Sequence, residues 1–213
     1  MRFFCFANNK YIQPTTMRIA VEGNIGAGKT SALEILEKNY DIDVRYEPTN
    51  DLTFQTLLKE YYENPRSRAF ALQSFLSCYH SKTKDAPDRG ITVTERSPTS
   101  SRMVFGEIIK NAGYMTPKEW HVYTTVDQTL GWTPDRIIYI HTPAHTCIDR
   151  IERRARAGEK GGGVDVLYLR QIEYQYEKLL KSFKKEHVCY IDGLLPSEEI
   201  AAKMFDAITA FAP

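Results

Sequence analysis

The stretch Gly23-Asn24-Ile25-Gly26-Ala27-Gly28-Lys29-Thr30 decides the fold of this chain. It matches the phosphate-binding pattern G-x-x-x-x-G-K-[ST], in which glycines let backbone N–H groups turn toward phosphate oxygens. An apolar run at 19–21 precedes it and a helical pattern at 31–39 follows it, which is the strand–loop–helix context that the motif requires. The alternative, a glycine-rich turn with a solvated lysine, does not need that context.

The loop predicts a bound nucleoside triphosphate and Mg²⁺. We expect residues 23–30 to surround the phosphates, the Lys29 ammonium to reach the β- and γ-phosphates, and the Thr30 hydroxyl to bind Mg²⁺. The chain lacks the N-K-x-D and D-x-x-G motifs of GTPase switch proteins. ATP is therefore the expected donor, and a switch protein is disfavoured.

Composition excludes several other classes of protein. The 213 residues are 42% apolar and 26% charged with a net charge of +1, which indicates a globular protein and argues against bulk nucleic-acid binding. No apolar run approaches the roughly 20 residues that span a bilayer, and no C-x-x-C pair indicates a zinc site. We expect a flexible extension at 1–16, one domain at 17–213 and a cytoplasmic location, with a mitochondrial presequence as the weaker alternative.

Short apolar runs alternate with longer amphipathic ones, which is typical of β-α repeats around a parallel sheet. Helix starts are marked by the capping box Thr116-Pro117-Lys118-Glu119, by Thr142-Pro143 and by Asp165. The prediction is an α/β P-loop kinase fold: a three-layer α/β/α arrangement with an Arg-rich lid. Its five parallel strands are expected at 18–21, 43–46, 91–94, 136–140 and 188–191.

Two acidic positions follow predicted strands, at the sheet edge where open α/β proteins bind ligands. Glu47 comes after the strand at 43–46 and could accept the proton of an attacking hydroxyl; the alternative is a surface residue before a turn proline. Glu95 and Arg96 close the strand at 91–94. Glu95 could join the Mg²⁺ shell and Arg96 could stabilise developing negative charge, although a simple ion pair would look the same in the sequence.

An arginine-rich segment at 150–163 ends in the glycine run 161–163. Residues 150, 153 and 154 share one helix face, which could hold an anion. The glycines would let the segment close over a nucleotide and exclude water. A solvated basic helix end is the alternative, and the phosphate loop favours the lid.

The order of these motifs resembles the deoxynucleoside kinases of the thymidine kinase 2, deoxycytidine kinase and insect deoxynucleoside kinase type. The resemblance runs from about residue 17 to about residue 180 and rests on an ordered combination of short motifs. In chain order these are the phosphate loop, Glu47-Pro48, Tyr62-Glu63-Asn64-Pro65 with Gln73, Glu95-Arg96-Ser97, and the R-x-R-x-x-E pattern of Arg154, Arg156 and Glu159.

The resemblance implies roles for the matching residues. Glu47 would be the general base at the substrate 5′-hydroxyl, with Arg96 as its partner. Tyr62 and Glu159 would bind the 3′-hydroxyl, Gln73 would read the Watson–Crick edge of the base, and Phe105 would stack on it. The phosphates would be held by the lid residues Arg150, Arg154 and Arg156. The family also implies a homodimer.

The chain departs from the family at three positions. Leu52 stands where a tryptophan is usual, which predicts a less aromatic wall around the base. His80 and Ser101 stand where the deoxycytidine enzyme has arginine and aspartate. Those two charged residues favour the amino edge of cytosine, so their absence leaves room for a 5-methyl group and moves the expected substrate toward thymidine or a broad pyrimidine range. His80 as a plain helix residue is the alternative.

The function expected from the sequence is ATP- and Mg²⁺-dependent phosphorylation of a deoxynucleoside 5′-hydroxyl. A nucleoside monophosphate kinase of the thymidylate type shares the loop and the sheet, but its acceptor carries a phosphate that a carboxylate such as Glu47 would repel. A catalytically silent nucleotide-binding subunit is the second alternative. It would be expected to lose the loop lysine, the base or the lid arginines, and this chain keeps all three.

Overall fold

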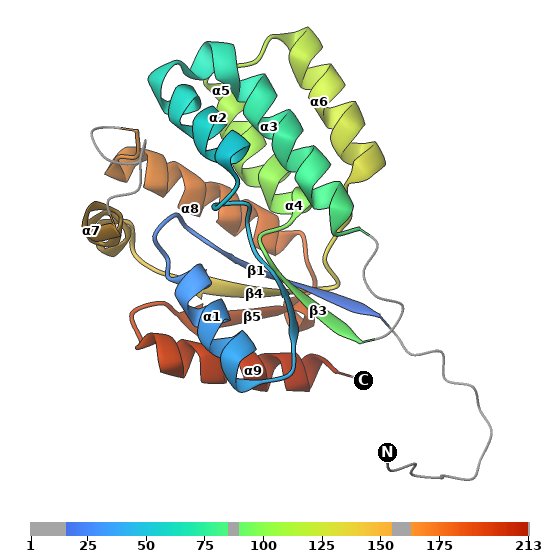
Figure 1. The fold of residues 1–213 in the computed structure, drawn as a ribbon, viewed down its shortest axis with the longest axis vertical. Coiled ribbons are helices and arrows are strands. Elements are labelled where there is room, and N and C mark those ends of the chain that lie inside the picture. The colour runs from blue at the N-terminus through green and yellow to red at the C-terminus, as the bar shows by residue number, and fades with distance from the viewer. Residues whose placement is uncertain (1–15, 85–89, 155–162, 213) are drawn as a thin grey trace, which may run out of the picture.

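The computed structural model describes residues 16–84, 90–154 and 163–212, and its core is a five-stranded parallel sheet (Figure 1). The strand order is β2-β3-β1-β4-β5 and every neighbouring pair is parallel. All five strands predicted from the sequence are present, with ends shifted by one or two residues at most. They are β1 (Met17–Gly23), β2 (Asp43–Arg45), β3 (Ile91–Glu95), β4 (Arg136–His141) and β5 (Val188–Asp192).

Helices cover both faces of the sheet, as predicted for an α/β/α arrangement. In Figure 1, α1 and α9 lie on one face, and α2, α3, α5, α6 and α8 form a thick helical layer on the other. The helices are α1 (Lys29–Asn39), α2 (Leu52–Glu63), α3 (Pro65–Lys82), α4 (Pro98–Ser100), α5 (Glu107–Asn111), α6 (Pro117–Leu130), α7 (Ala144–Arg154), α8 (Val166–Lys181) and α9 (Ser197–Phe211), with a π-helical stretch η1 (Ser101–Gly106) and a short 3-10 turn η2 (Lys185–His187).

Helices begin at the three predicted positions: α6 after Thr116, α7 after Thr142-Pro143 and α8 after Asp165. The Thr116 hydroxyl accepts a hydrogen bond from the Glu119 backbone N–H at 3.2 Å, and the Glu119 carboxylate accepts one from the Thr116 N–H at 2.8 Å. Asp165 caps α8 by accepting a bond from the Tyr168 N–H at 2.7 Å. These side chains satisfy backbone donors that have no partner inside the helix.

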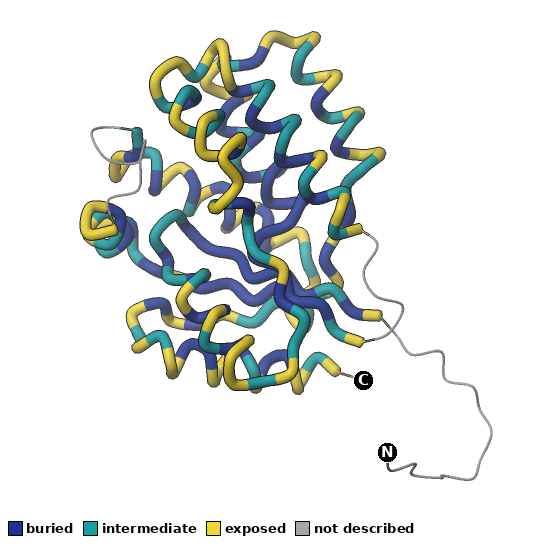
Figure 2. The backbone as a smooth tube through the Cα atoms, viewed as in Figure 1, coloured by how far each residue is buried: buried dark blue, intermediate teal, exposed yellow. Residues whose placement is uncertain are grey.

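The core lies between the sheet and its two helical layers (Figure 2). Strand β4 is buried along Ile137–Ile140 because β1 and β5 pair with its two sides and helices cover both faces. One face of α8 packs against this core, since Leu169, Ile172, Tyr176 and Leu179 are all buried. The strands' carboxyl ends are thereby fixed in place, and the functional side chains follow directly after them. No helix in the described ranges is long and apolar enough to cross a membrane.

Candidate active site

The phosphate loop joins β1 to α1 and its glycines take conformations that other residues avoid. Gly26 has φ 78°, and a Cβ there would lie 2.7 Å from the Cys147 carbonyl oxygen of α7. A Cβ on Gly23 would lie 2.6 Å from the Ile140 carbonyl oxygen of β4. The loop is therefore pressed against β4 and α7, and only glycine allows that close approach.

Lys29 is buried beneath the loop. Its Nζ donates to the carbonyl oxygens of Asn24 at 2.9 Å and Gly23 at 3.3 Å. Burial and the neighbouring Arg96 lower the pKa of this ammonium to about 8. A bound phosphate would stabilise the charged form of Lys29 and raise its pKa again.

Thr30 and Glu95 lie together where β3 ends beside the loop. The Thr30 hydroxyl donates to Glu95 Oε1 at 2.7 Å, and burial together with Glu47 raises the pKa of the Glu95 carboxyl. Glu95 Oε2 is buried and has no partner among the described residues. A hydroxyl and an unpartnered carboxylate oxygen fit Mg²⁺, which prefers oxygen ligands. No group of three His, Cys, Asp or Glu residues in the described part could hold a metal, so phosphates and water would complete the shell.

Glu47 and Arg96 form an ion pair beside this corner, with Arg96 Nε 2.9 Å from the carboxylate; Arg96 is buried and Glu47 is partly buried. The Arg96 backbone has φ 64°, a left-handed conformation that is rare outside glycine. Its Nη1 donates to the Gly23 carbonyl oxygen at 3.1 Å and the Tyr176 hydroxyl at 2.5 Å. The guanidinium also lies 4.6 Å from the ring centroid of Phe105. The side chain is thus held from four directions, with its charge between the phosphate loop and Glu47.

A cavity of about 560 Å³ runs from the phosphate loop into the helical layer. Lys29, Thr30, Glu95 and Arg96 line one end of it, with Glu47 beside them. The other end is lined mainly by aromatic and aliphatic side chains of the helices, together with the amide of Gln73; it includes Phe54, Tyr61, Tyr62, Leu72, Leu76, Phe105 and Ile109. One chamber therefore offers a phosphate site, a carboxylate–guanidinium pair and an apolar compartment for a flat ligand.

Residues 19–211 match the family model for deoxynucleoside kinase. The chain belongs to the deoxynucleoside kinase family. It is 32% identical to a probable deoxycytidine kinase of Fowlpox virus, over 81% of this chain and 75% of that protein. It is 30% identical to a putative kinase protein of Invertebrate iridescent virus 3, over 84% of this chain and 90% of that protein. A deoxyadenosine kinase from M. mycoides has the same fold, with a TM-score of 0.78 over 92% of this chain and all of that one, at 19% identity.

In this deoxynucleoside kinase the inner end of the cavity is lined by α2, α3, η1 and α5, and Tyr123 of α6 lies behind Gln73. Gln73 is 2% exposed and its Oε1 accepts a hydrogen bond from the Tyr123 hydroxyl at 3.2 Å. His80 is also buried, with Nε2 3.1 Å from the Ser101 hydroxyl oxygen. Burial lowers the pKa of His80 to about 4, so its ring is neutral at pH 7. His80 and Ser101 therefore form a polar pair, of which Ser101 lines the cavity.

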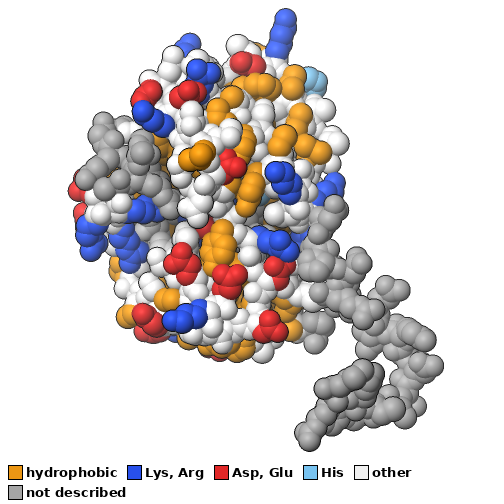
Figure 3. Space-filling model, viewed as in Figure 1, with side chains coloured by type: hydrophobic (Ala, Val, Ile, Leu, Met, Phe, Trp, Pro, Cys, Tyr) orange, Lys and Arg blue, Asp and Glu red, His pale blue; other side chains and the backbone are white. Residues whose placement is uncertain are grey.

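The predicted lid is partly described. Arg150 donates from Nη1 to the Ala27 carbonyl oxygen at 3.2 Å and from Nη2 to the Gly193 carbonyl oxygen at 2.8 Å, so it ties α7 to the phosphate loop. Arg154 lines the cavity. Figure 3 shows Lys and Arg side chains gathered where α7 lies in Figure 1. Arg156 and Glu159 lie outside the described residues, so their predicted roles stay predictions.

One prediction about the compartment for the base is wrong. Leu52 was expected in the wall, but it begins α2 with its side chain 78% exposed and does not line the cavity. Phe54, two residues later, is buried and does line it. The reason is helical geometry: positions 52 and 54 point about 200° apart around α2. Phe54 rather than Leu52 therefore lies in the wall.

Two functional neighbours of Arg96 were not predicted. Glu22 is fully buried, and it accepts hydrogen bonds from the Ser97 hydroxyl at 2.7 Å and the Tyr176 hydroxyl at 2.9 Å. Burial raises the pKa of Glu22, while Arg96 opposes that shift. The sequence carried a signal for Glu22, a single acid inside an apolar strand. It carried none for Tyr176, whose position fits an apolar stripe.

The lowered pKa of Lys29 predicts proton uptake when nucleotide binds. Near pH 9, Lys29 is mostly neutral in the protein without nucleotide, and a bound triphosphate favours its charged form. Nucleotide binding should therefore take up about one proton. The affinity for nucleotide should weaken as the pH rises above about 8. Titration calorimetry in buffers of different ionisation enthalpy measures this uptake. Lys29→Arg, which stays charged, should abolish it; equal uptake by the variant would contradict the assignment.

Proposed function

We propose that this deoxynucleoside kinase transfers the γ-phosphoryl group of ATP to the 5′-hydroxyl of a deoxynucleoside, with thymidine or a broad range of pyrimidines as substrates. The observation that carries the proposal is the Glu47–Arg96 pair, 2.9 Å apart, between the phosphate loop and an apolar compartment that ends at Gln73. A nucleoside in that compartment, its base toward Gln73 and Phe105, would have its 5′-hydroxyl near Glu47.

Each residue would act by position and charge. Glu47 accepts the proton of the 5′-hydroxyl as the oxygen attacks phosphorus. Lys29 and Arg96 stabilise the negative charge of the transferring group, and both are already fixed by hydrogen bonds. Mg²⁺ held by Thr30 and Glu95 would neutralise phosphate charge. Tyr62 lines the cavity where a sugar 3′-hydroxyl could bind.

A panel of nucleosides in a coupled assay of ADP release tests the proposal. We expect turnover with thymidine and other deoxynucleosides and none with thymidine monophosphate, because its phosphate would meet the Glu47 carboxylate. Preference for the monophosphate would identify a thymidylate-type kinase instead. Binding of ATP without turnover on any acceptor would identify a silent subunit. The homodimer implied by the family is tested by sedimentation equilibrium.

The neutral His80–Ser101 pair supports the preference for a 4-oxo base, and exchanging it should change that preference. We expect the double variant His80→Arg/Ser101→Asp to raise the deoxycytidine-to-thymidine ratio of kcat/KM by about 10- to 100-fold. A charged acceptor would then meet the cytosine amino group, and hydrogen bonds to charged groups contribute about 1.5–3 kcal/mol. Melting temperature controls for folding. A folded double variant with an unchanged ratio would show that this pair does not face the base.

A further inference from the structure

The Gln73 amide has two orientations that read opposite base edges. Its carbonyl oxygen accepts hydrogen bonds and its NH₂ group donates them. A 4-oxo pyrimidine presents an acceptor at position 4 and a donor at N3, whereas a 4-amino pyrimidine presents the reverse. An amide that rotates freely by 180° can pair with both edges. An amide held in one orientation pairs well with only one of them.

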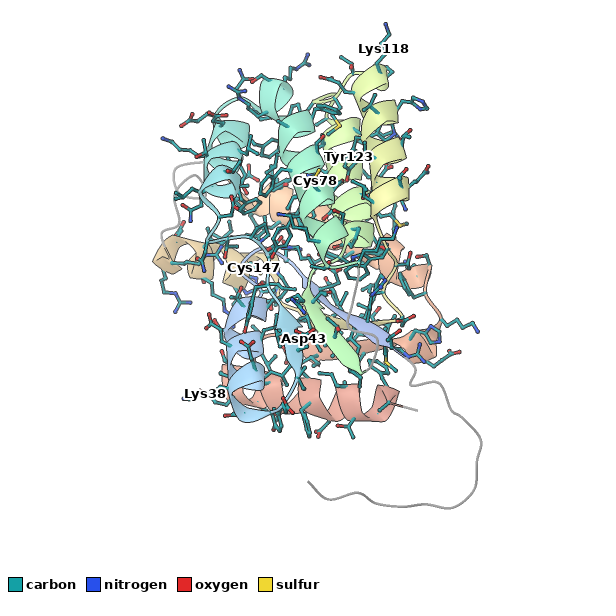
Figure 4. All side chains as sticks on the ribbon, turned by 45° about the vertical axis from the view of Figure 1, so that its right-hand side comes forward. Lys38, Asp43, Cys78, Lys118, Tyr123 and Cys147 are labelled. Atoms are coloured by element: carbon teal, nitrogen blue, oxygen red, sulfur yellow. The ribbon has the colours of Figure 1, made fainter. Side chains whose placement is uncertain are left out.

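The structure holds this amide through Tyr123 of α6. The Tyr123 hydroxyl donates to Gln73 Oε1 at 3.2 Å, and the two side chains are 0% and 2% exposed. The Tyr123 ring is itself fixed, because it packs 5.6 Å from Trp120 and leaves little room over Gly106, where an added Cβ would lie 3.2 Å from Tyr123 Cε1. Figure 4 shows Tyr123 inside the helical layer.

In the opposite orientation the amide NH₂ group would face the Tyr123 hydroxyl, and the hydroxyl proton would lose the acceptor that the structure gives it, Gln73 Oε1. Among the described residues, Gln73 is the partner that the structure gives to this hydroxyl. Burial and the neighbouring Asp127 raise the pKa of Tyr123, so the group keeps its proton. A buried donor left unsatisfied costs about 1–3 kcal/mol, which corresponds to a preference of about 5- to 150-fold for the observed orientation.

We propose that Tyr123 is a positioning residue that holds the Gln73 amide in one orientation and thereby sets the discrimination between 4-oxo and 4-amino pyrimidine nucleosides. This rests on the proposed function, in which Gln73 contacts the base. Tyr123 touches neither the sugar nor the phosphates in that arrangement. It acts on specificity through Gln73 alone, while Glu47 and Arg96 at the other end of the cavity carry the chemistry.

The test is Tyr123→Phe, which removes one oxygen atom and keeps the ring. We expect the ratio of kcat/KM for thymidine over deoxycytidine to move toward one by about tenfold, because the amide can then turn to suit either base. The kcat for the better substrate should stay within about twofold of the wild-type value. A purely structural effect would lower kcat/KM equally for both substrates and leave their ratio unchanged.

Tyr139→Phe is the matched control, since it removes the hydroxyl of another buried tyrosine, in β4. Its ratio should equal that of the wild type. If Tyr123→Phe is unfolded at the assay temperature, the ratio is measured below its melting temperature, where the same change is expected.

An unchanged ratio in a folded Tyr123 variant would overturn the proposal, and so would a wild-type ratio already near one. Failure of the wild-type protein to phosphorylate either nucleoside is a different result, because it would remove the proposed function itself.

Discussion

Glu47→Gln should lower kcat by at least ~10²-fold with little change in the affinity for ATP. Glutamine keeps the shape of the side chain and a hydrogen-bonding oxygen for Arg96, but it cannot accept the proton of the attacking hydroxyl. General-base catalysis typically contributes about 10²- to 10⁴-fold. Steady-state ADP release gives kcat, and titration with an ATP analogue gives the affinity.

Glu60→Gln is the matched control for this variant. Glu60 pairs with Arg68 at 2.9 Å, the same separation as in the Glu47–Arg96 pair, but both side chains are much more exposed and do not line the cavity. Its kcat should equal that of the wild type. Near-normal turnover by a folded Glu47→Gln protein would show that another group takes the proton.

Arg96→Lys should have a still larger effect, a loss of about 10³-fold in kcat. Lysine keeps a positive charge near Glu22 and Glu47, but it cannot make the separate contacts of Nε and Nη1 with Glu47, Gly23 and Tyr176. A fixed arginine beside a transferring phosphoryl group contributes on the order of 10³-fold or more. Single-turnover measurements at saturating ATP and nucleoside isolate the chemical step.

Loss of stability is the competing explanation for this result. Arg96 is 4% exposed beside the buried Glu22, and an unpaired buried charge costs about 3–5 kcal/mol. Lysine limits that cost because it preserves the charge, and the melting temperature shows how much remains. Arg68→Lys, in the exposed Glu60–Arg68 pair, should change neither kcat nor the melting temperature. A folded Arg96→Lys protein with wild-type kcat would contradict the role of the guanidinium.

Much of this architecture could be predicted because its causes are local. The glycines of the loop, the capping box at Thr116 and the continuous apolar run of β4 each act through neighbouring residues, so the sequence alone reveals them. The positions of Glu47 and Glu95-Arg96 followed from a general rule, since the carboxyl ends of parallel strands meet at one edge of the sheet.

What failed or was missed depends on the angle around a helix and on pairs distant in sequence. Leu52 was placed in the wall from its match to the family's tryptophan position, and such a match does not reveal which way a helix turns its side chains. Tyr123 matches the pattern of a packing residue, and its bond to Gln73 crosses from one helix to another.

The sequence by itself determined a P-loop α/β fold, predicted an ATP site, and placed Glu47 and Arg96 at the edge of the sheet. The tertiary structure decided how that pair is held: Glu22 and Tyr176 come together across 154 positions to fix Arg96. It also decided which side chain holds the Gln73 amide, because it brings the Tyr123 hydroxyl to Gln73 Oε1. Burial is the physical reason. Buried polar atoms must find partners wherever the packing of helices and strands brings them, and those partners leave no local trace in the sequence.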